Sequence, residues 1–256
     1  VLMFHYITND QFKKFENLIK LLRKQFHIIS PLEFNEIKLL KKKIFKDTIL
    51  LTFDDGYKSQ YIITKKVLNK HKIKALYFVT LNFIKIKSKK KIKNFLKNNL
   101  KVNENYKKNF SYIKNMNILD IKNLIKSGHK IGAHTINHYD LPNVSSSIQK
   151  KEINNYKKNF NKNFGKKKID HFAFTFGELK NLDFSSLELS LNSYNFVHTG
   201  IRGNNYQKSK KVIFRDNCDL NQSLKEILFF LNGFGDFYYF FKRLSLNSIL
   251  RRISKN

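Results

Sequence analysis

The sequence holds a single cysteine, Cys218, among its 256 residues. One thiol cannot form an intramolecular disulfide or supply a cysteine-rich zinc site. Long apolar runs are also missing, because no stretch approaches the roughly 18 consecutive apolar residues of a membrane span. The opening VLMFHYITND lacks the charged start of an export signal. We therefore expect a fold that depends on apolar burial and a cytoplasmic location, or an extracytoplasmic one if a signal precedes Val1.

Acidic residues are scarce, with 19 Asp and Glu against 50 Lys and Arg, for a net charge of +31. A chain this basic favours polyanions or anionic surfaces. However, the lysines are spread along the whole chain, and Lys, Asn, Ile and Phe are abundant together, as a mutational bias on codons would produce without any partner. We favour the compositional explanation and do not expect nucleic acid as a partner.

Short apolar runs alternate with helical periodicities along the chain. The predicted strands are 1–7, 27–29, 49–53, 75–79, 129–133, 171–175, 196–198 and 211–214. The predicted helices are 10–22, 31–42, 58–70, 117–126, 147–161 and 220–231. Repeated strand–helix units of this kind predict one α/β domain over residues 1–231, with a parallel sheet that is open or closed into a barrel. The Lys- and Asn-rich stretch 82–115 interrupts the rhythm and is predicted to be a surface insertion.

Three distinctive turns follow predicted strands, at the end where parallel α/β folds present their reacting groups. They are Asp54-Asp55-Gly56, the pair His134 and His138 in GAHTINH, and the aromatic run FAFTFG at 172–177. An Asp-Asp-Gly alone is commonly a turn, and a lone histidine pair is more often incidental. Their conjunction in one alternating chain is much harder to obtain by accident.

The histidine pair and the aspartates together are typical of a catalytic metal site. Two histidines four residues apart can face the same way on a helical turn, and one carboxylate from another strand completes three ligands with an open position. Adjacent Asp54 and Asp55 repel each other unless something uses or neutralises the charge. The aspartate that does not bind the metal could remove a proton from the attacking water.

These motifs resemble those of the polysaccharide deacetylase family, the NodB-homology domain of carbohydrate esterase family four. Its TFDDG motif stands here at 52–56, its H-[ST]-x-x-H motif at 134–138, and the FAYPFG motif of one branch as FAFTFG. The opening VLMFHYIT is similar to the first strand of that branch, and the likeness covers most of residues 1–216.

The resemblance implies a distorted (β/α) barrel that removes the acyl group from an N-acylated sugar, with an N-acetylated glycan as substrate. It implies that Asp54 is the general base and that Asp55, His134 and His138 hold a divalent metal, usually zinc. A backbone amide near Phe176 would stabilise the oxyanion. We accordingly place the remaining substrate and oxyanion contacts at Tyr57, Phe176 and Gly177.

Four further positions carry expectations from the resemblance. His5 ends the first strand and is expected to line the site, and Arg215 is expected to orient Asp54. His198 is the positional candidate for the general acid of other branches, although a histidine at a strand end is as readily explained by packing. Thr175 replaces the proline of the third motif, which implies a less rigid loop and lower activity.

The segment 232–256 is aromatic and basic and follows the catalytic domain. It could lie in a membrane interface, which would favour a lipid-linked sugar as substrate, or it could close the bottom of the barrel or pack on a neighbour. Two other functions stay open at this point. The same site could deformylate a formamido sugar, or an inactive barrel could bind nucleic acid or membranes through its charge.

Overall fold

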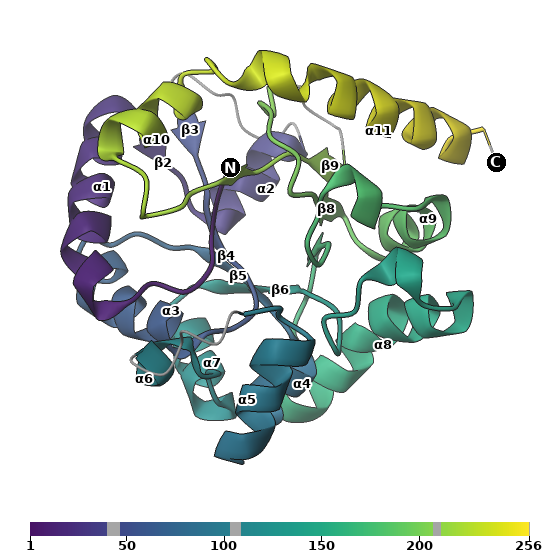
Figure 1. Ribbon diagram of the computed structural model, residues 1–256, viewed down its shortest axis with the longest axis horizontal. Helices are drawn as coiled ribbons and strands as arrows, with labels where there is room; N and C mark the ends of the chain where they lie inside the picture. The colour runs from purple at the N-terminus through teal and green to yellow at the C-terminus, as the bar shows by residue number, and fades with distance from the viewer. Residues whose placement is uncertain (40–46, 103–108, 207–210, 256) are drawn as a thin grey trace.

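A computed structural model describes residues 1–39, 47–102, 109–206 and 211–255 of the chain. Its main sheet has eight strands in the order β10-β1-β4-β5-β6-β7-β8-β9, and every neighbouring pair is parallel. The strands are β1 (Leu2–Phe4), β4 (Leu51–Phe53), β5 (Leu76–Val79), β6 (Lys130–Ala133), β7 (His171–Ala173), β8 (Phe196–His198), β9 (Val212–Ile213) and β10 (Asp216–Asn217). The sheet curls into a half-barrel with helices around it, which confirms the predicted fold class (Figure 1).

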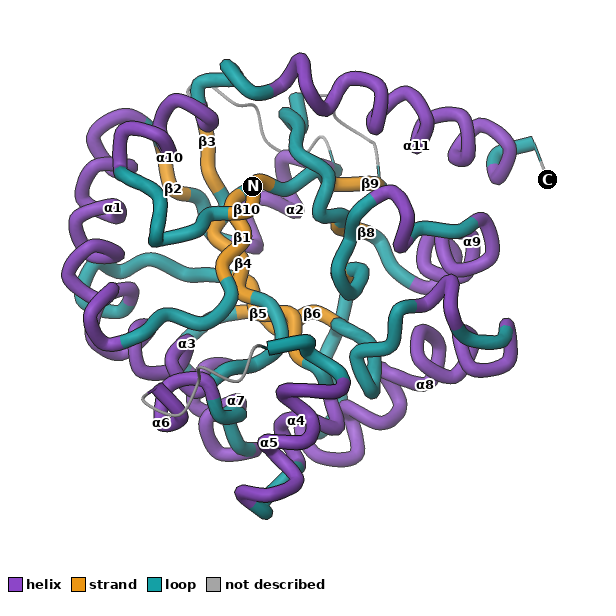
Figure 2. The backbone as a smooth tube through the Cα atoms, viewed as in Figure 1, coloured by secondary structure: helices purple, strands orange, loops and turns teal. Residues whose placement is uncertain are grey.

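The helices surround the curled sheet, as Figure 2 shows. The longer ones are α1 (Phe12–Gln25), α5 (Lys89–Asn98), α7 (Ile118–Lys126), α8 (Ser146–Phe164), α9 (Phe184–Ser193), α10 (Leu224–Leu231) and α11 (Phe240–Ile253). Helix α3 (Lys58–Ile63) continues into a π-helical turn, η2 (Thr64–Leu68). Among the described residues, no helix has the length and apolar content needed to cross a membrane.

Helix α2 (Pro31–Lys38) lies inside the ring of helices (Figure 1). Its Phe34 and Ile37 pack with inward side chains of the strands, among them Phe78 and Phe196. The predicted helix start is confirmed, because the Ser30 hydroxyl accepts from the Glu33 N–H and the Glu33 carboxylate accepts from the Ser30 N–H. The predicted end near Lys42 lies outside the described residues.

Some local predictions differ from the structure. The run predicted as one strand at 49–53 is divided, because β3 (Thr48–Ile49) pairs with β2 (His27–Ile28) in a separate sheet while β4 joins the barrel. Helices α9 and α11 and strand β10 were not predicted. Helix α9 is rich in serine and has no clear apolar stripe, and β10 is only two residues long, so neither leaves a local pattern to read.

The stretch 82–115 does more than lie on the surface. It forms much of α4 (Leu81–Lys85), all of α5, and α6 (Phe110–Ile113), which share a small core of their own. This core consists of Tyr57, Phe83, Ile92, Leu96, Leu100 and Ile113. Apolar side chains at helical spacing are buried between the lysines, and they hold this segment beside Tyr57, next to the motif aspartates.

Candidate active site

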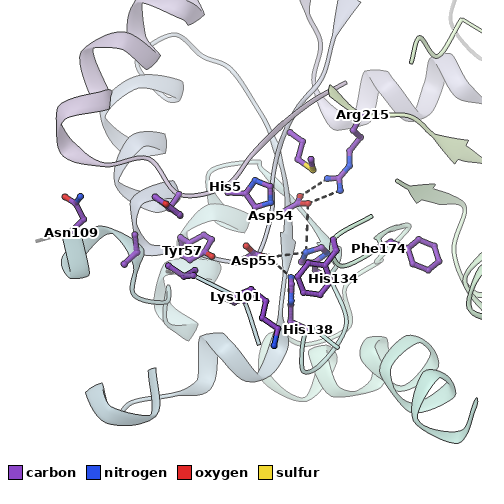
Figure 3. A pocket seen from close by; sticks show the side chains of 16 residues that line it. His5, Asp54, Asp55, Tyr57, Lys101, Asn109, His134, His138, Phe174 and Arg215 are labelled. Atoms are coloured by element: carbon purple, nitrogen blue, oxygen red, sulfur yellow. Dashed lines mark hydrogen bonds and ion pairs between the residues drawn. The ribbon is translucent and has the colours of Figure 1, made fainter. Parts of the chain in front are cut away.

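Three potential metal ligands converge at the carboxyl ends of the strands (Figure 3). Asp55 follows β4, whereas His134 and His138 follow β6. The Nε2 atoms of His134 and His138 lie 3.1 and 3.0 Å from the same Asp55 oxygen, Oδ1. All three side chains are buried, and their ligand atoms lie within 4.8 Å of one another.

The other ring nitrogens fix how these histidines are protonated. His134 Nδ1 lies 2.9 Å from the Ala173 carbonyl oxygen, and His138 Nδ1 lies 3.0 Å from the Asn99 carbonyl oxygen. A carbonyl only accepts, so each Nδ1 carries a proton and donates it, and in the neutral rings each Nε2 presents a lone pair to Asp55. Asp55 Oδ1 is buried and lacks a hydrogen-bond donor. Three acceptors directed at one point fit a divalent cation with three protein ligands.

The electrostatics of the cluster also favour a positive charge. Burial by itself would raise the pKa of the Asp55 carboxyl, but the His138 and His134 rings hold that pKa well below its usual range. Burial would likewise lower the pKa of His134, but the bond to Asp55 and the charge of Asp54 raise it. The cluster therefore attracts a cation, either a proton on His134 or a metal.

The His134–His138 turn is not helical, so the predicted helical turn is wrong. Thr135 and His138 have φ of 57° and 60°, and the Thr135 hydroxyl accepts from the His138 N–H at 2.9 Å. The N–H groups of Ile136 and Asn137, which lie between Thr135 and His138, both donate to the carboxylate of buried Glu152 on α8, each at 2.8 Å. Sequence reasoning missed Glu152, because a glutamate in a predicted helix has no feature that ties it to a distant turn.

Backbone strain gathers at this site. Six described residues other than glycine have positive φ, namely Asp55, Lys72, Lys101, Thr135, His138 and Phe176. Four of them line one cavity and Thr135 bonds His138, which leaves only Lys72 elsewhere. Left-handed backbone at non-glycine residues costs free energy and is kept mainly where function requires it. The strain therefore makes this cavity the candidate functional site.

Asp54 is held beside the cluster by Arg215. The two guanidinium N–H groups donate to the two carboxylate oxygens at 2.7 and 2.8 Å, and both side chains are almost completely buried. Arg215 is itself fixed by a bond from its Nε to the Thr199 carbonyl, 2.8 Å long. Asp54 Oδ2 lies 4.0 Å from His134 Nε2. The structure thus places Arg215 where it can orient Asp54.

The cavity has a volume of about 480 Å³ and contains most of the predicted site residues. His5 and Tyr57 line it together with Phe176, whose ring centroid lies 5.0 Å from that of His138. Burial, followed by the charge of Asp55, raises the pKa of Tyr57 well above its usual value. Its hydroxyl therefore stays protonated and can donate.

Gly177 follows Phe176 in the chain, and the prediction that it contacts the substrate is not supported, because it is not among the residues that line the cavity. Its N–H donates to the Thr175 carbonyl at 2.7 Å, and its carbonyl accepts from the Gly200 N–H at 2.7 Å. The Thr175 hydroxyl donates to the Tyr139 carbonyl at 2.5 Å. These bonds anchor the loop at the position where the family carries proline.

His198 does not reach the cavity. It is fully buried inside the half-barrel, with its Nε2 3.0 Å from His171 Nδ1 and its ring 4.8 Å from that of Phe78. Burial, then the neighbouring His171 and Arg215, lowers the pKa of His198 well below its usual value. The general-acid expectation for His198 is therefore wrong in this structure, and the packing alternative describes it.

The stretch 82–115 adds cavity residues that the sequence did not indicate. Leu100, Lys101, Val102 and Asn109 line the cavity, and Figure 3 shows Lys101 beside His138 and Asn109 farther away. The Asn99 side-chain amide also donates to the Asn137 carbonyl at 2.8 Å. A lysine-rich run offers no pattern that distinguishes these residues from a solvated surface.

Comparison with known proteins agrees with the motifs. A family model described as polysaccharide deacetylase matches residues 41–188, more than half of the chain. The chain belongs to the polysaccharide deacetylase family. A protein of Geobacillus stearothermophilus, described as an uncharacterized 30.6 kDa protein in the fumA 3′ region, is 30% identical to this deacetylase-family chain over 111 residues. That match spans 42% of the chain and only 30% of the relative.

Solved structures show the same fold. The Streptococcus pyogenes deacetylase PplD, in complex with acetate, is 19% identical, with a TM-score of 0.67 over 89% of this deacetylase-family chain and 95% of PplD. IcaB from Ammonifex degensii is 17% identical, with a TM-score of 0.67 over 88% of this chain and 94% of IcaB.

Proposed function

We propose that this member of the polysaccharide deacetylase family is a metal-dependent hydrolase that removes the N-acetyl group from an N-acetylated sugar. The sugar would belong to a polysaccharide, an oligosaccharide or a lipid-linked glycan precursor. One observation carries the proposal. The Arg215-bound carboxylate of Asp54 stands beside three convergent acceptors, of Asp55, His134 and His138, in one cavity.

Asp55, His134 and His138 would hold the metal, and we infer Zn²⁺ from two imidazoles and one carboxylate. When bound, a divalent metal supplies Lewis-acid polarisation of the amide carbonyl and acidifies water. The Nδ1 bonds to Ala173 and Asn99 hold both rings in the required orientation.

The chain's own groups would then move the protons. Asp54 takes a proton from the attacking water, and Arg215 keeps its carboxylate aimed at that water. The Tyr57 hydroxyl and a backbone amide near Phe176 would donate to the developing oxyanion. His5, which also lines the cavity, is the group we assign to protonate the leaving amine. The C–N bond breaks and yields acetate and the free amino sugar.

The names of structurally similar proteins support an acetyl substrate. PplD is described as a deacetylase with bound acetate. The Aggregatibacter actinomycetemcomitans protein, 12% identical and with a TM-score of 0.64, is described as a de-N-acetylase.

The test combines metal content with product release. Purified wild-type protein is expected to contain about one equivalent of metal and to release acetate from N-acetylhexosamine oligomers or lipid-linked N-acetyl sugars. A double variant, His134→Ala with His138→Ala, should lose both. The matched control is His27→Gln, because the His27 side chain is 57% exposed and outside the cavity.

Three outcomes discriminate the alternatives. Metal binding without acetate from any of these substrates would refute the proposed substrate and leave the metal site intact. Formate release from a formamido sugar would identify a deformylase. Little metal in the wild type, under conditions that do not strip it, would refute the hydrolase mechanism.

A further inference from the structure

The C-terminal part of the chain exposes an unusual amount of apolar surface. Of the fourteen large hydrophobic side chains exposed among the described residues, seven lie within residues 229–244. We call them the aromatic ridge, which consists of Phe229, Phe234, Phe237, Tyr238, Phe240, Phe241 and Leu244. Exposed apolar clusters of this kind mark interaction sites.

The ridge is not the face that attaches this segment to the barrel. Helices α10 and α11 bury Ile227 and Leu246 against the main core, with Leu228 and Ile249 packed beside them. The alternative that this segment closes the bottom of the barrel therefore accounts only for its inner face. Helix α11 runs along the rim of the molecule (Figure 2), and the ridge side chains remain exposed.

Exposed rings of the ridge contact one another in pairs, namely Phe229 with Phe234, Phe237 with Tyr238, and Phe240 with Phe241. Phe229 and Phe234 stack with centroids 4.7 Å apart and an interplanar angle of 14°, yet they are 50% and 65% exposed. Phe237 and Tyr238 are 76% and 80% exposed. Five phenylalanines and one leucine in the ridge have no polar atom, so the boundary of lipid acyl chains is the environment in which they gain most.

The charge around the ridge favours an anionic surface. Residues 224–255 contain six basic side chains, namely Lys225, Lys242, Arg243, Arg251, Arg252 and Lys255, against Glu226 and Asp236. Lys242, Arg251 and Arg252 are exposed. A second copy of this chain also has a net charge of +31, so two copies repel each other, whereas an anionic bilayer attracts the basic segment.

We propose that the aromatic ridge docks this protein on the surface of an anionic lipid bilayer. The rings enter the headgroup and acyl-chain boundary, and Lys242, Arg251 and Arg252 face the lipid headgroup charges. Buried apolar area and the attraction of basic side chains to anionic lipids add their contributions to peripheral binding.

The absence of tryptophan makes a direct test possible. Phe237→Trp places the only tryptophan of the chain on the ridge, and Leu119→Trp places it on α7, where Leu119 is 63% exposed. We expect a blue shift of the Phe237→Trp emission with vesicles of phosphatidylcholine containing about one third phosphatidylglycerol. We expect none with pure phosphatidylcholine vesicles, and none for Leu119→Trp with either.

Vesicle flotation measures the strength of binding. Phe237→Ser with Phe241→Ser should lower the partition coefficient at least about tenfold, whereas the matched control, Leu32→Ser with Leu119→Ser, should not. Lys242→Glu with Arg251→Glu should also weaken binding, and added salt should weaken the wild type. The metal content of these variants and their activity on a soluble substrate should match those of the wild type. This proposal and the proposed function can therefore fail separately.

Four results would overturn the proposal. They are an unshifted Phe237→Trp spectrum, equal binding to zwitterionic and anionic vesicles, dimers formed through the ridge without lipid, and single-stranded nucleic acid that displaces the vesicles from the ridge.

Discussion

The Arg215 guanidinium binds the Asp54 carboxylate through two parallel hydrogen bonds, although 161 positions separate the two residues in the chain. Asp54 follows β4, and Arg215 lies between β9 and β10. The curled sheet brings these two ends together, since β10 pairs with β1 and β1 with β4. The pair fixes the direction of the carboxylate before any substrate binds.

Arg215→Lys tests the two parallel hydrogen bonds to Asp54, because lysine keeps the positive charge but cannot make both bonds. We expect kcat to fall roughly a hundredfold with little change in KM. The matched control is Arg202→Lys, since Arg202 pairs with Asp216 at 3.1 Å and does not line the catalytic cavity. Equal losses of kcat in both variants, in step with their thermal stability, would argue for a merely structural role of Arg215.

The two adjacent aspartates should behave differently. Asp54→Asn should retain the metal and lose about 10²–10⁴-fold in kcat, because the general base is removed. Asp55→Asn should lose both the activity and the metal, because one of the three metal ligands is weakened. Elemental analysis and acetate release distinguish the two variants. Loss of metal from Asp54→Asn alone would reverse the assignment.

Asn99 should tune the metal site from the lysine-rich stretch. Its backbone carbonyl accepts a hydrogen bond from His138 Nδ1, and its side-chain amide donates to the Asn137 backbone carbonyl. Asn99→Ala keeps the backbone carbonyl but removes the side-chain bond that holds it in place, so metal affinity is expected to fall about tenfold, the low end of the effect of disturbing a partner of a metal ligand. The neighbouring Asn98→Ala is the control, since Asn98 is exposed. Chelator competition measures both affinities, and equal affinities would contradict the prediction.

Gly177 should be required for the loop that carries Phe176. Gly177 and Gly165 have φ of 63° and 71°, but a Cβ on Gly177 would lie 2.5 Å from the Gly200 nitrogen, whereas one on Gly165 meets nothing within 4 Å. Gly165→Ala therefore costs only backbone strain, about 1–3 kcal/mol of unfolding free energy. Gly177→Ala should lose more and should also lower kcat. Denaturant titration and acetate release check both, and matching losses would contradict the role of the contact.

Stability should fall in acid because buried histidines are kept neutral. Burial, then Lys74, lowers the pKa of His129 to about 4, and burial, then Lys130, lowers that of His171 to about 3. Unfolded histidine titrates near 6.5. Below about pH 6.5 the unfolded state therefore binds more protons than the folded state, so the free energy of unfolding falls as the pH falls toward about 4.

Urea unfolding from pH 7 to pH 4 measures this loss. His129→Gln removes one of the titrating groups, so its stability should depend less steeply on pH than that of the wild type. The exposed His27→Gln should keep the wild-type slope. An unchanged slope for His129→Gln would show that His129 is not responsible.

Much of the fold was predictable because its causes are local. An apolar run of strand length, and a capping box such as those that begin at Ser30 and Asn117, each involve only a few consecutive residues. The elements that were missed lack such patterns. The division of the 49–53 run depends on which neighbours pair with it, and no residue inside the run specifies them.

The sequence by itself determined the alternating α/β architecture, the family motifs and the strand ends at which Asp54, Asp55, His134 and His138 stand. These features follow from periodicity and from residue types at fixed spacing. Only the tertiary structure decided that Arg215 binds Asp54 through two parallel hydrogen bonds, that Glu152 and Asn99 hold the histidine turn, and that His198 packs in the core and does not line the cavity. Each of these depends on contacts between segments far apart in the chain, whose packing no local pattern records.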